Sequence, residues 1–219
     1  MDHRTLRILR PGIVPYAEGL ELQAELVKQR RAGEIPDTLV LLEHPHVITL
    51  GTGAHEENVL LGPEERARRG IELFPAGRGG DVTYHGPGQL VGYPILALDE
   101  DRRDLHRYLR DIEEVLISLF ADYGLTGRRR EGMTGAWVAD RKLAAIGVRV
   151  SSGWITSHGF ALNVTTDLSF FDAIIPCGIS DYGVGSLQGE LGRSVEVAEV
   201  AQRLVRHFER VFDAEAVDG

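Results

Sequence analysis

The sequence predicts an α+β fold in layers, with a mixed, largely antiparallel sheet packed against helices. Short apolar runs typical of strands are interleaved with a few helical segments, without the regular alternation of a βαβ repeat. Segments 105–123 and 197–212 carry apolar residues at three- and four-residue spacing, as helices that cover a sheet do. Three strand-like runs between 135 and 165 follow one another closely, which favours an antiparallel meander.

The first half of the chain is predicted to mix short strands with two helices. Residues 6–9 form a strand, and a helix begins at Pro15 and runs to about Arg31, where Gly33 ends it. Two apolar runs around His44-Pro45 are predicted to be strands joined by a tight turn. The elements expected in this half after the first helix are strands over 38–42, 47–50, 72–75 and 89–98 and a small helix over 63–69.

The second half begins with the clearest helix, over 105–123, which Gly124 ends. A hairpin is expected around Asp140-Arg141-Lys142, followed by a third strand over 154–165 and a short helix near 167–173. A helix over 197–212 closes the fold. No linker or internal repeat interrupts the chain, so residues 1–219 are expected to form one domain.

Composition and charge exclude several functional classes. With 43% hydrophobic and 26% charged residues, the chain is typical of globular proteins rather than of disordered or fibrous ones. The net charge of −9 argues against a general nucleic-acid binder, which gains affinity by neutralising phosphates. The single cysteine permits neither an intrachain disulfide nor a zinc-thiolate cluster. Without a signal peptide or an apolar run long enough to span a membrane, the protein is expected to be soluble, reduced and cytoplasmic.

The segment Gly77–Gly88 is dense in glycine and is predicted to form neither a stable helix nor a plain strand interior. It lacks the Gly-Lys-Ser/Thr of a phosphate-binding loop and does not match the dinucleotide fingerprint. Polar side chains stand between glycines that let a ligand approach the backbone. A loop that contacts substrate is therefore favoured over a mere turn.

Cys177 and Lys142 are the candidate reactive groups. Cys177 lies between Pro176 and Gly178, which places it on a bend rather than inside a packed helix. A reactive thiolate needs a nearby cation, a histidine or a helix N-terminus, and Lys142, His85 and His158 are all candidates for that partner. Only two of the 24 basic residues are lysines, so Lys142 is interpreted as a position that needs a compact ammonium with an adjustable pKa.

Other polar clusters are better explained by structure than by chemistry. His44 and His46 flank a proline without a third ligand at helical spacing, so structural histidines are favoured over a metal site. His158 precedes a glycine at the end of a strand and is a candidate pocket residue. The run Arg128–Arg130 is expected to be a solvated loop that offers a local basic surface to an acidic partner.

Several segments together resemble the lipoyl(octanoyl) transferase family of the biotin/lipoate protein ligase superfamily. The resemblance covers most of the chain in the same order, and it is carried by Leu42–Pro45, Gly77–Gln89, Arg141–Gly147, His158–Asn163 and Pro176–Ile179. It implies a biotin/lipoate-ligase-like catalytic domain that transfers an octanoyl group from octanoyl-acyl carrier protein to a lysine of a lipoyl domain. The acceptors so implied are the lipoyl domains of 2-oxoacid dehydrogenase complexes and the glycine cleavage H protein.

The same resemblance implies roles for individual residues. Cys177 would form the acyl-thioester, and Lys142 would lower the pKa of its thiol. The residues implied to line the substrate site are Arg78, Gly79, Gly80, Asp81, Val82, Thr83, Tyr84, His85, Ala145, Ile146, Gly147, Gly159, Phe160 and Ala161.

The chemistry of such a transfer agrees with these residues. Exchange of a thioester with a cysteine thiol is nearly isoenergetic and amide formation is downhill, so no ATP, metal or other cofactor is expected. Covalent catalysis lets two bulky protein substrates visit one site in turn. At ~0.8 kcal/mol per buried CH₂, an octanoyl tail contributes about 5 kcal/mol, enough to select it over acetyl.

Three other functions remain open from the residues. An ATP-dependent lipoate- or biotin-protein ligase would share the fold without needing Cys177. A Cys-His thioester hydrolase would use Cys177 with His85 or His158 and would release free acid without an acceptor. A non-catalytic acyl-binding module would bind octanoyl without becoming covalently loaded.

Overall fold

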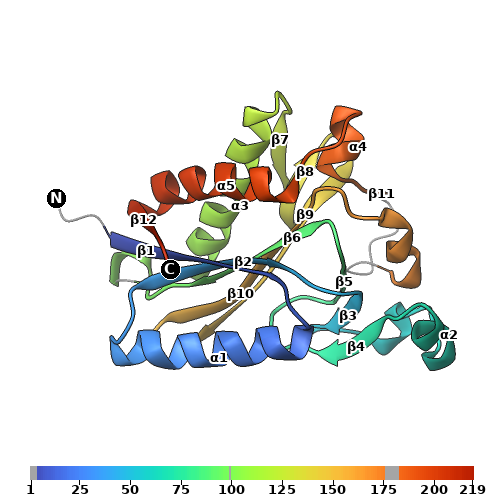
Figure 1. Ribbon diagram of the computed structural model, residues 1–219, viewed down its shortest axis with the longest axis horizontal. Coiled ribbons are helices and arrows are strands. Elements are labelled where there is room, and N and C mark those ends of the chain that lie inside the picture. The colour runs from blue at the N-terminus through green and yellow to red at the C-terminus, as the bar shows by residue number, and fades with distance from the viewer. Residues whose placement is uncertain (1–3, 99, 176–182) are drawn as a thin grey trace.

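The computed structural model describes residues 4–98, 100–175 and 183–219. Its main sheet has nine strands (Figure 1). Its order is β12-β1-β2-β6-β10-β9-β8-β7, with β11 paired to β9. The pairs β12–β1, β1–β2 and β11–β9 are parallel and the others antiparallel, so the predicted mixed, largely antiparallel sheet is confirmed. The strands are β1 (Arg4–Ile13), β2 (Asp37–Glu43), β6 (Gln89–Ile95), β7 (Gly127–Arg130), β8 (Met133–Val138), β9 (Arg141–Ser151), β10 (Ile155–Asn163), β11 (Gly183–Val184) and β12 (Ala214–Asp218).

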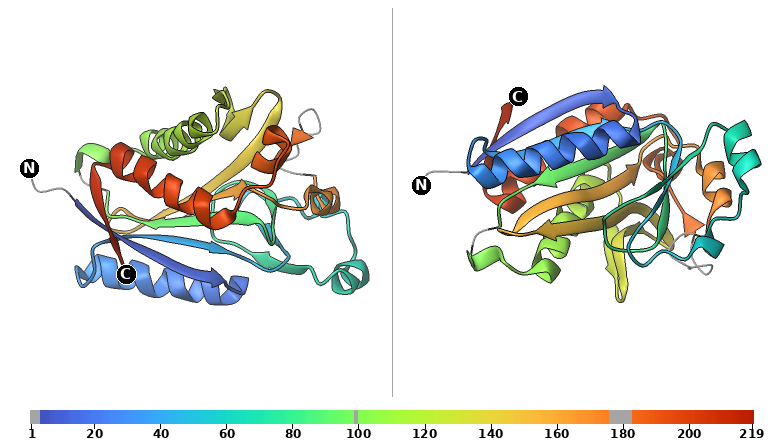
Figure 2. Two further views of the ribbon diagram at one scale, coloured as in Figure 1. Left: turned by 45° about the horizontal axis from the view of Figure 1, so that its top comes forward. Right: turned by 90° about the horizontal axis from the view of Figure 1, so that it is seen from below.

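Helices cover both faces of this sheet (Figure 2). Helix α1 (Tyr16–Ala32) lies on one face, and α3 (Leu105–Asp122) and α5 (Val197–Phe212) lie on the other. The predicted helix over 105–123 is confirmed: the Asp104 side chain caps it by accepting hydrogen bonds from the backbone of His106 and Arg107. Gly33 ends α1 in a left-handed conformation with φ 73°, as expected of a glycine cap.

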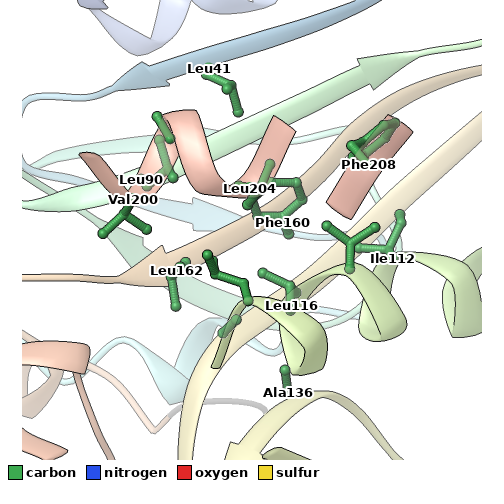
Figure 3. Packing of buried hydrophobic residues seen from close by; sticks show 14 of the residues in the cluster. Leu41, Leu90, Ile112, Leu116, Ala136, Phe160, Leu162, Val200, Leu204 and Phe208 are labelled. Atoms are coloured by element: carbon green, nitrogen blue, oxygen red, sulfur yellow. The ribbon is translucent and has the colours of Figure 1, made fainter. Parts of the chain in front are cut away.

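The larger hydrophobic core lies between the sheet and the α3–α5 pair. Figure 3 shows side chains of both helices meeting side chains of β6 and β10, among them Leu116, Leu204, Leu162 and Phe160. A second cluster fills the space between the sheet and α1. The sheet is thus buried on both faces, which holds its strands in a rigid frame.

A second sheet of three strands, in the order β4-β3-β5, packs beside the α1 face (Figure 1). Its strands are β3 (Val47–Leu50), β4 (Glu72–Pro75) and β5 (Val82–His85). The short helix α2 (Pro63–Arg68) precedes β4, and 3₁₀ turns occupy Glu56–Asn58, Glu100–Arg102 and Leu168–Ala173.

The two strands predicted over 38–42 and 47–50 are confirmed, but the expectation for the glycine-dense segment was wrong. Strands β2 and β3 belong to different sheets. The connection between the two strands contains His44, which is fully buried. Its ring bonds the Val14 carbonyl and the Tyr93 hydroxyl, both at 2.6 Å, so the chain passes through the core between the two sheets. The glycine-dense segment also contains a regular strand, β5, because 82–85 carry no glycine and pair with β3.

Further elements were not predicted, among them the two-residue strand β11. Arg128–Arg130 lie in β7 rather than in a solvated loop. The short helix α4 (Leu187–Leu191) follows β11, and β12 adds a parallel strand at the edge of the sheet beside β1. The meander β8-β9-β10 is confirmed, although Lys142 lies in β9 rather than in the turn before it.

Candidate functional site

The main candidate site is a cavity between the α1 face of the sheet and the segment Gly79–His85, and we call it the acyl cavity after the substrate that the sequence resemblance implies. Thirteen of the fourteen residues predicted to line a substrate site surround it; Tyr84 is the one that does not. It is lined by Tyr16, Arg78, Gly79, Gly80, Asp81, Val82, Thr83, His85, Val91, Tyr93, Ala145, Ile146, Gly147, His158, Gly159, Phe160 and Ala161.

Glycines bring the loop and the sheet together at this cavity. Gly147 of β9 pairs in register with Gly159 of β10. A Cβ on Gly147 would lie 3.0 Å from the Gly79 carbonyl oxygen, which is closer than ordinary contact. Because that Cβ is missing, the loop lies directly on β9, and the Gly79 N–H donates to the Val148 carbonyl at 3.0 Å.

Arg78 and Asp81 hold the loop from the other side. The buried Arg78 guanidinium donates to the carbonyl and hydroxyl oxygens of Thr49, at 2.9 and 2.8 Å. Asp81 accepts from the Asn58 side-chain amide at 2.7 Å and from the backbone N–H groups of His55 and Val82. Both side chains thus anchor the cavity wall to the small sheet and to the segment before α2.

Tyr84 points away from the cavity. Its ring packs in the core of the small sheet, stacked on Phe170 with 5.4 Å between ring centroids. Its hydroxyl lies 2.7 Å from Nδ1 of His46. Alternation along β5 explains this placement, because successive side chains of a strand face opposite sides.

Four of the lining residues have aromatic or imidazole side chains that the sequence did not predict as a group, and we call them the inner wall. They are Tyr16, His85, Tyr93 and His158. His85 bonds the Gln89 amide oxygen at 2.8 Å and stacks on Tyr16. Burial, with a contribution from His44, lowers the pKa of His85 to about 3. Burial, and then Arg78, lowers the pKa of His158 to about 4. Both imidazoles are therefore neutral at pH 7.

Lys142 stands beside the acyl cavity rather than in its wall. It lines a smaller adjacent cavity, which we call the lysine cavity, together with Thr83, Ala145 and Ala161 that also line the acyl cavity. Its ammonium nitrogen lies 4.9 Å from the centroid of the Trp137 ring, a cation–π arrangement. The lysine cavity is completed by Gln89, Asn163, Phe171 and Val184.

Cys177 lies outside the described residues, and hydrogen bonds hold the described chain before and after it, with the later segment beside Lys142. Before it, the Ile175 N–H donates to the Asn58 carbonyl at 2.8 Å. After it, β11 pairs with β9 so that Val184 stands opposite Lys142. The Gly185 N–H donates to the Lys142 carbonyl at 3.0 Å, and the Asn163 amide donates to the Gly185 carbonyl at 3.0 Å.

The other polar clusters serve the fold. No group of three histidine, cysteine or acidic side chains within 4–98, 100–175 and 183–219 is arranged to hold a metal ion. His44 and His46 make internal bonds, as expected of structural histidines. Carboxylates pair with Arg128–Arg130: Asp140 contacts the first and third arginines, and Glu113 and Glu114 contact the second. In the same ranges, no helix is long and apolar enough to cross a membrane.

The sequence is similar to curated octanoyltransferases over nearly its whole length. It is 59% identical over 202 residues to the octanoyltransferase of Rubrobacter xylanophilus, covering 92% of this chain and 90% of the relative. It is 52% identical over 208 residues to that of Solibacter usitatus, covering 95% and 93%. The profile described as the lipoyl protein ligase A/B catalytic domain matches residues 15–209.

Solved structures agree in fold at much lower sequence identity. A lipoate-protein ligase A bound with ATP superposes with a TM-score of 0.75 at 17% identity, covering 100% of this chain and 90% of that one. A bipartite lipoate protein ligase from Thermoplasma acidophilum gives 0.73 at 18%, covering 100% and 87%. With a profile match over most of its length and relatives above 50% identity, this chain belongs to the lipoyl protein ligase A/B catalytic domain family and, within it, to the octanoyltransferases, which are acyltransferases.

Proposed function

We propose that this protein transfers an octanoyl group from octanoyl-acyl carrier protein to a lysine of a lipoyl domain, through a thioester on Cys177. The acceptors would be lipoyl domains of 2-oxoacid dehydrogenase complexes and the glycine cleavage H protein. The octanoyltransferase relatives support the reaction class. The reaction would be the first step of endogenous protein lipoylation.

The observation that carries the proposal is the acyl cavity next to Lys142. Its lining includes the apolar residues Val91, Ala145 and Ala161, and it shares Thr83, Ala145 and Ala161 with the lysine cavity. An acyl chain in the first cavity would present its carbonyl end toward the second. Burial of its methylenes from water stabilises the bound chain.

The reaction then proceeds by two exchanges at one carbonyl carbon. The Cys177 thiolate attacks the donor thioester, the carbon–sulfur bond to the carrier breaks, and the carrier thiolate takes up a proton. The acceptor amine next attacks the new thioester, the bond to Cys177 breaks, and the amine loses a proton as the amide forms. We assign to Lys142 the cation that favours the Cys177 thiolate and the proton exchanged with the leaving thiol or the amine.

Intact-mass spectrometry after mixing with octanoyl-acyl carrier protein tests the intermediate. We expect a gain of one octanoyl group that hydroxylamine removes and that Cys177→Ala does not show. The absence of an adduct in the wild-type protein, with acceptor and hydrolysis excluded, would remove Cys177 from the mechanism.

Two rival reactions are separated by their substrates. An ATP-dependent ligase, which the fold alone would also permit, would octanoylate a lipoyl domain from free octanoate and ATP, and Cys177→Ser would retain that activity. A Cys-His hydrolase would release octanoate without an acceptor. We expect octanoylated lipoyl domain from the carrier-bound donor without ATP, and little free acid.

We also propose that residues 1–219 act as one catalytic domain in the cytoplasm. The small sheet and the main sheet share the acyl cavity, so neither would make the site by itself. A reducing compartment keeps the one cysteine of the chain as a free thiol.

A further inference from the structure

A second cavity on the α1 face adjoins the acyl cavity, and we call it the α1 groove. Its residues from α1 are Leu20, Gln23, Ala24, Val27 and Arg31, and those opposite are Gly77, Arg149, Ser151, Ser157 and His158. The apolar part of its α1 wall is formed by Leu20, Ala24 and Val27, of which Ala24 is exposed to solvent. The groove therefore offers apolar surface that an extended hydrocarbon chain could cover.

His158 lines both the acyl cavity and the α1 groove. Its side chain is 94% buried, since the residue is only 6% exposed. Its backbone has φ 55°, a left-handed conformation that is strained for most side chains. The Gln23 side chain of α1 holds it there by accepting a hydrogen bond from the His158 N–H at 2.7 Å.

The His158 imidazole is also held against the aromatic wall of the acyl cavity. Its ring meets Tyr93 edge-on, with 6.3 Å between the centroids. Its Nδ1 atom is buried and has no hydrogen-bond partner among the residues that the structure describes. The low pKa keeps the ring neutral, so it closes the cavity without bringing a charge into it.

His158 lies at the end of the acyl cavity that is opposite the lysine cavity. Lys142 and the lysine cavity lie toward Asn163 along β10, and the shared residue Ala161 marks the passage into the acyl cavity. From Ala161 to His158 the strand advances three residues, or about 10 Å at its usual rise, a length that an extended eight-carbon chain fills.

We propose that His158 is the chain-length determinant: its imidazole separates the acyl cavity from the α1 groove and sets the upper limit of the acyl chain. A longer chain would have to press methylenes against the buried imidazole or displace it. Without that side chain, the two cavities would join and the extra methylenes would lie along Leu20, Ala24 and Val27. This inference rests on the proposed function, because it takes the acyl cavity as the seat of the octanoyl tail.

The test compares octanoyl-, dodecanoyl- and hexadecanoyl-acyl carrier protein as donors, with acylation of a lipoyl domain followed by mass. His158→Gly relieves the strained φ and removes the imidazole. We expect it to raise the dodecanoyl-to-octanoyl ratio of kcat/KM by at least about tenfold, since each buried methylene adds to binding. His158→Asn, smaller than histidine and tolerant of the same backbone, is the second variant and should shift the ratio in the same direction.

Two controls separate a passage from a general loosening. Ser157→Ala changes a residue that lines only the groove, and the ratio should stay at the wild-type value. Ala24→Phe fills the groove from an exposed helical position, so it should leave octanoyl transfer unchanged by itself and reverse the gain when combined with His158→Gly. Melting curves confirm that each variant is folded.

The possible outcomes are distinct. Octanoyl transfer by the wild-type protein with an unchanged chain-length ratio in both folded His158 variants would overturn this inference and leave the proposed function intact. A gain that Ala24→Phe does not reverse would also overturn it, because the longer chain would then not occupy the groove. Failure of the wild-type protein to transfer octanoyl would instead contradict the proposed function.

Discussion

Lys142 differs from most basic residues of this chain in its type and in its surroundings. Almost every basic position is an arginine, and the structure pairs several of these with exposed carboxylates. Lys142 is half-buried in β9, between the lysine cavity and the Trp137 ring. As a residue type, lysine can serve as an acid or base, whereas the guanidinium of arginine stays charged.

Lys142→Arg is therefore expected to keep the positive charge and lose the activity. We expect octanoyl transfer to the lipoyl domain to fall by about 100-fold or more, the usual contribution of a positioned acid or base. Lys28→Arg, at an exposed position on α1, is the matched control and should be silent. Turnover near the wild-type rate in Lys142→Arg would show that charge alone suffices at this position.

At the scale of elements, Glu113 connects three of them. It lies on α3, is fully buried, and accepts hydrogen bonds from Arg110 of the same helix at 2.6 Å and from Arg129 of β7 at 3.1 Å. Its second oxygen accepts from the backbone N–H of Gly135 in β8 at 3.1 Å. The carboxylate thus docks the edge of the sheet onto the helix, and Gly135 stands close to the Lys142 side chain.

Removal of this carboxylate should destabilise the protein more than a surface substitution does. We expect Glu113→Ala to lower the free energy of unfolding by about 2–4 kcal/mol, because the Gly135 N–H and the arginines lose their partner in a buried place. Glu113→Gln, which keeps one acceptor, should cost less. Urea unfolding measures both, and Glu114→Ala, at a partly exposed neighbour, is the control.

The helices and the meander were predictable because their signals are local. The spacing of apolar residues in α3 and α5 and the glycines after α1 and α3 lie within a few turns of the positions that they determine. By contrast, β12 is a five-residue strand of mixed polarity, and its pairing depends on the sheet edge that β1 offers. The residues of β3 are mostly apolar, but their sequence does not indicate whether the strand joins the main sheet or the small sheet.

At the scale of the whole molecule, buried neutral histidines make stability depend on pH. The pKa of His85 is lowered to about 3 and that of His158 to about 4, while in the unfolded chain each is near 6.5. Between those values only the unfolded chain binds the proton, so protonation favours unfolding. The stability from burying these histidines is therefore complete above pH 6.5 and is lost as the pH falls below it.

We expect the free energy of unfolding to fall by roughly 2 kcal/mol per histidine between pH 6.5 and about pH 5. Urea titrations at the two pH values measure this loss. In His85→Gln the loss should be smaller, whereas His106→Gln, at an exposed position on α3, should leave it unchanged. An equal loss in all three proteins would assign the pH dependence to other groups.

The sequence by itself determined the main helices and the meander, because these depend on residue type and short-range spacing. Its resemblance to a known family implied thirteen of the residues that line the acyl cavity. Only the tertiary structure decided that Tyr84 faces the small sheet, that Tyr16 and Tyr93 join the inner wall, and that His158 stands between two cavities. These outcomes depend on strand register and on contacts between segments far apart in the chain, and no local pattern encodes either of them.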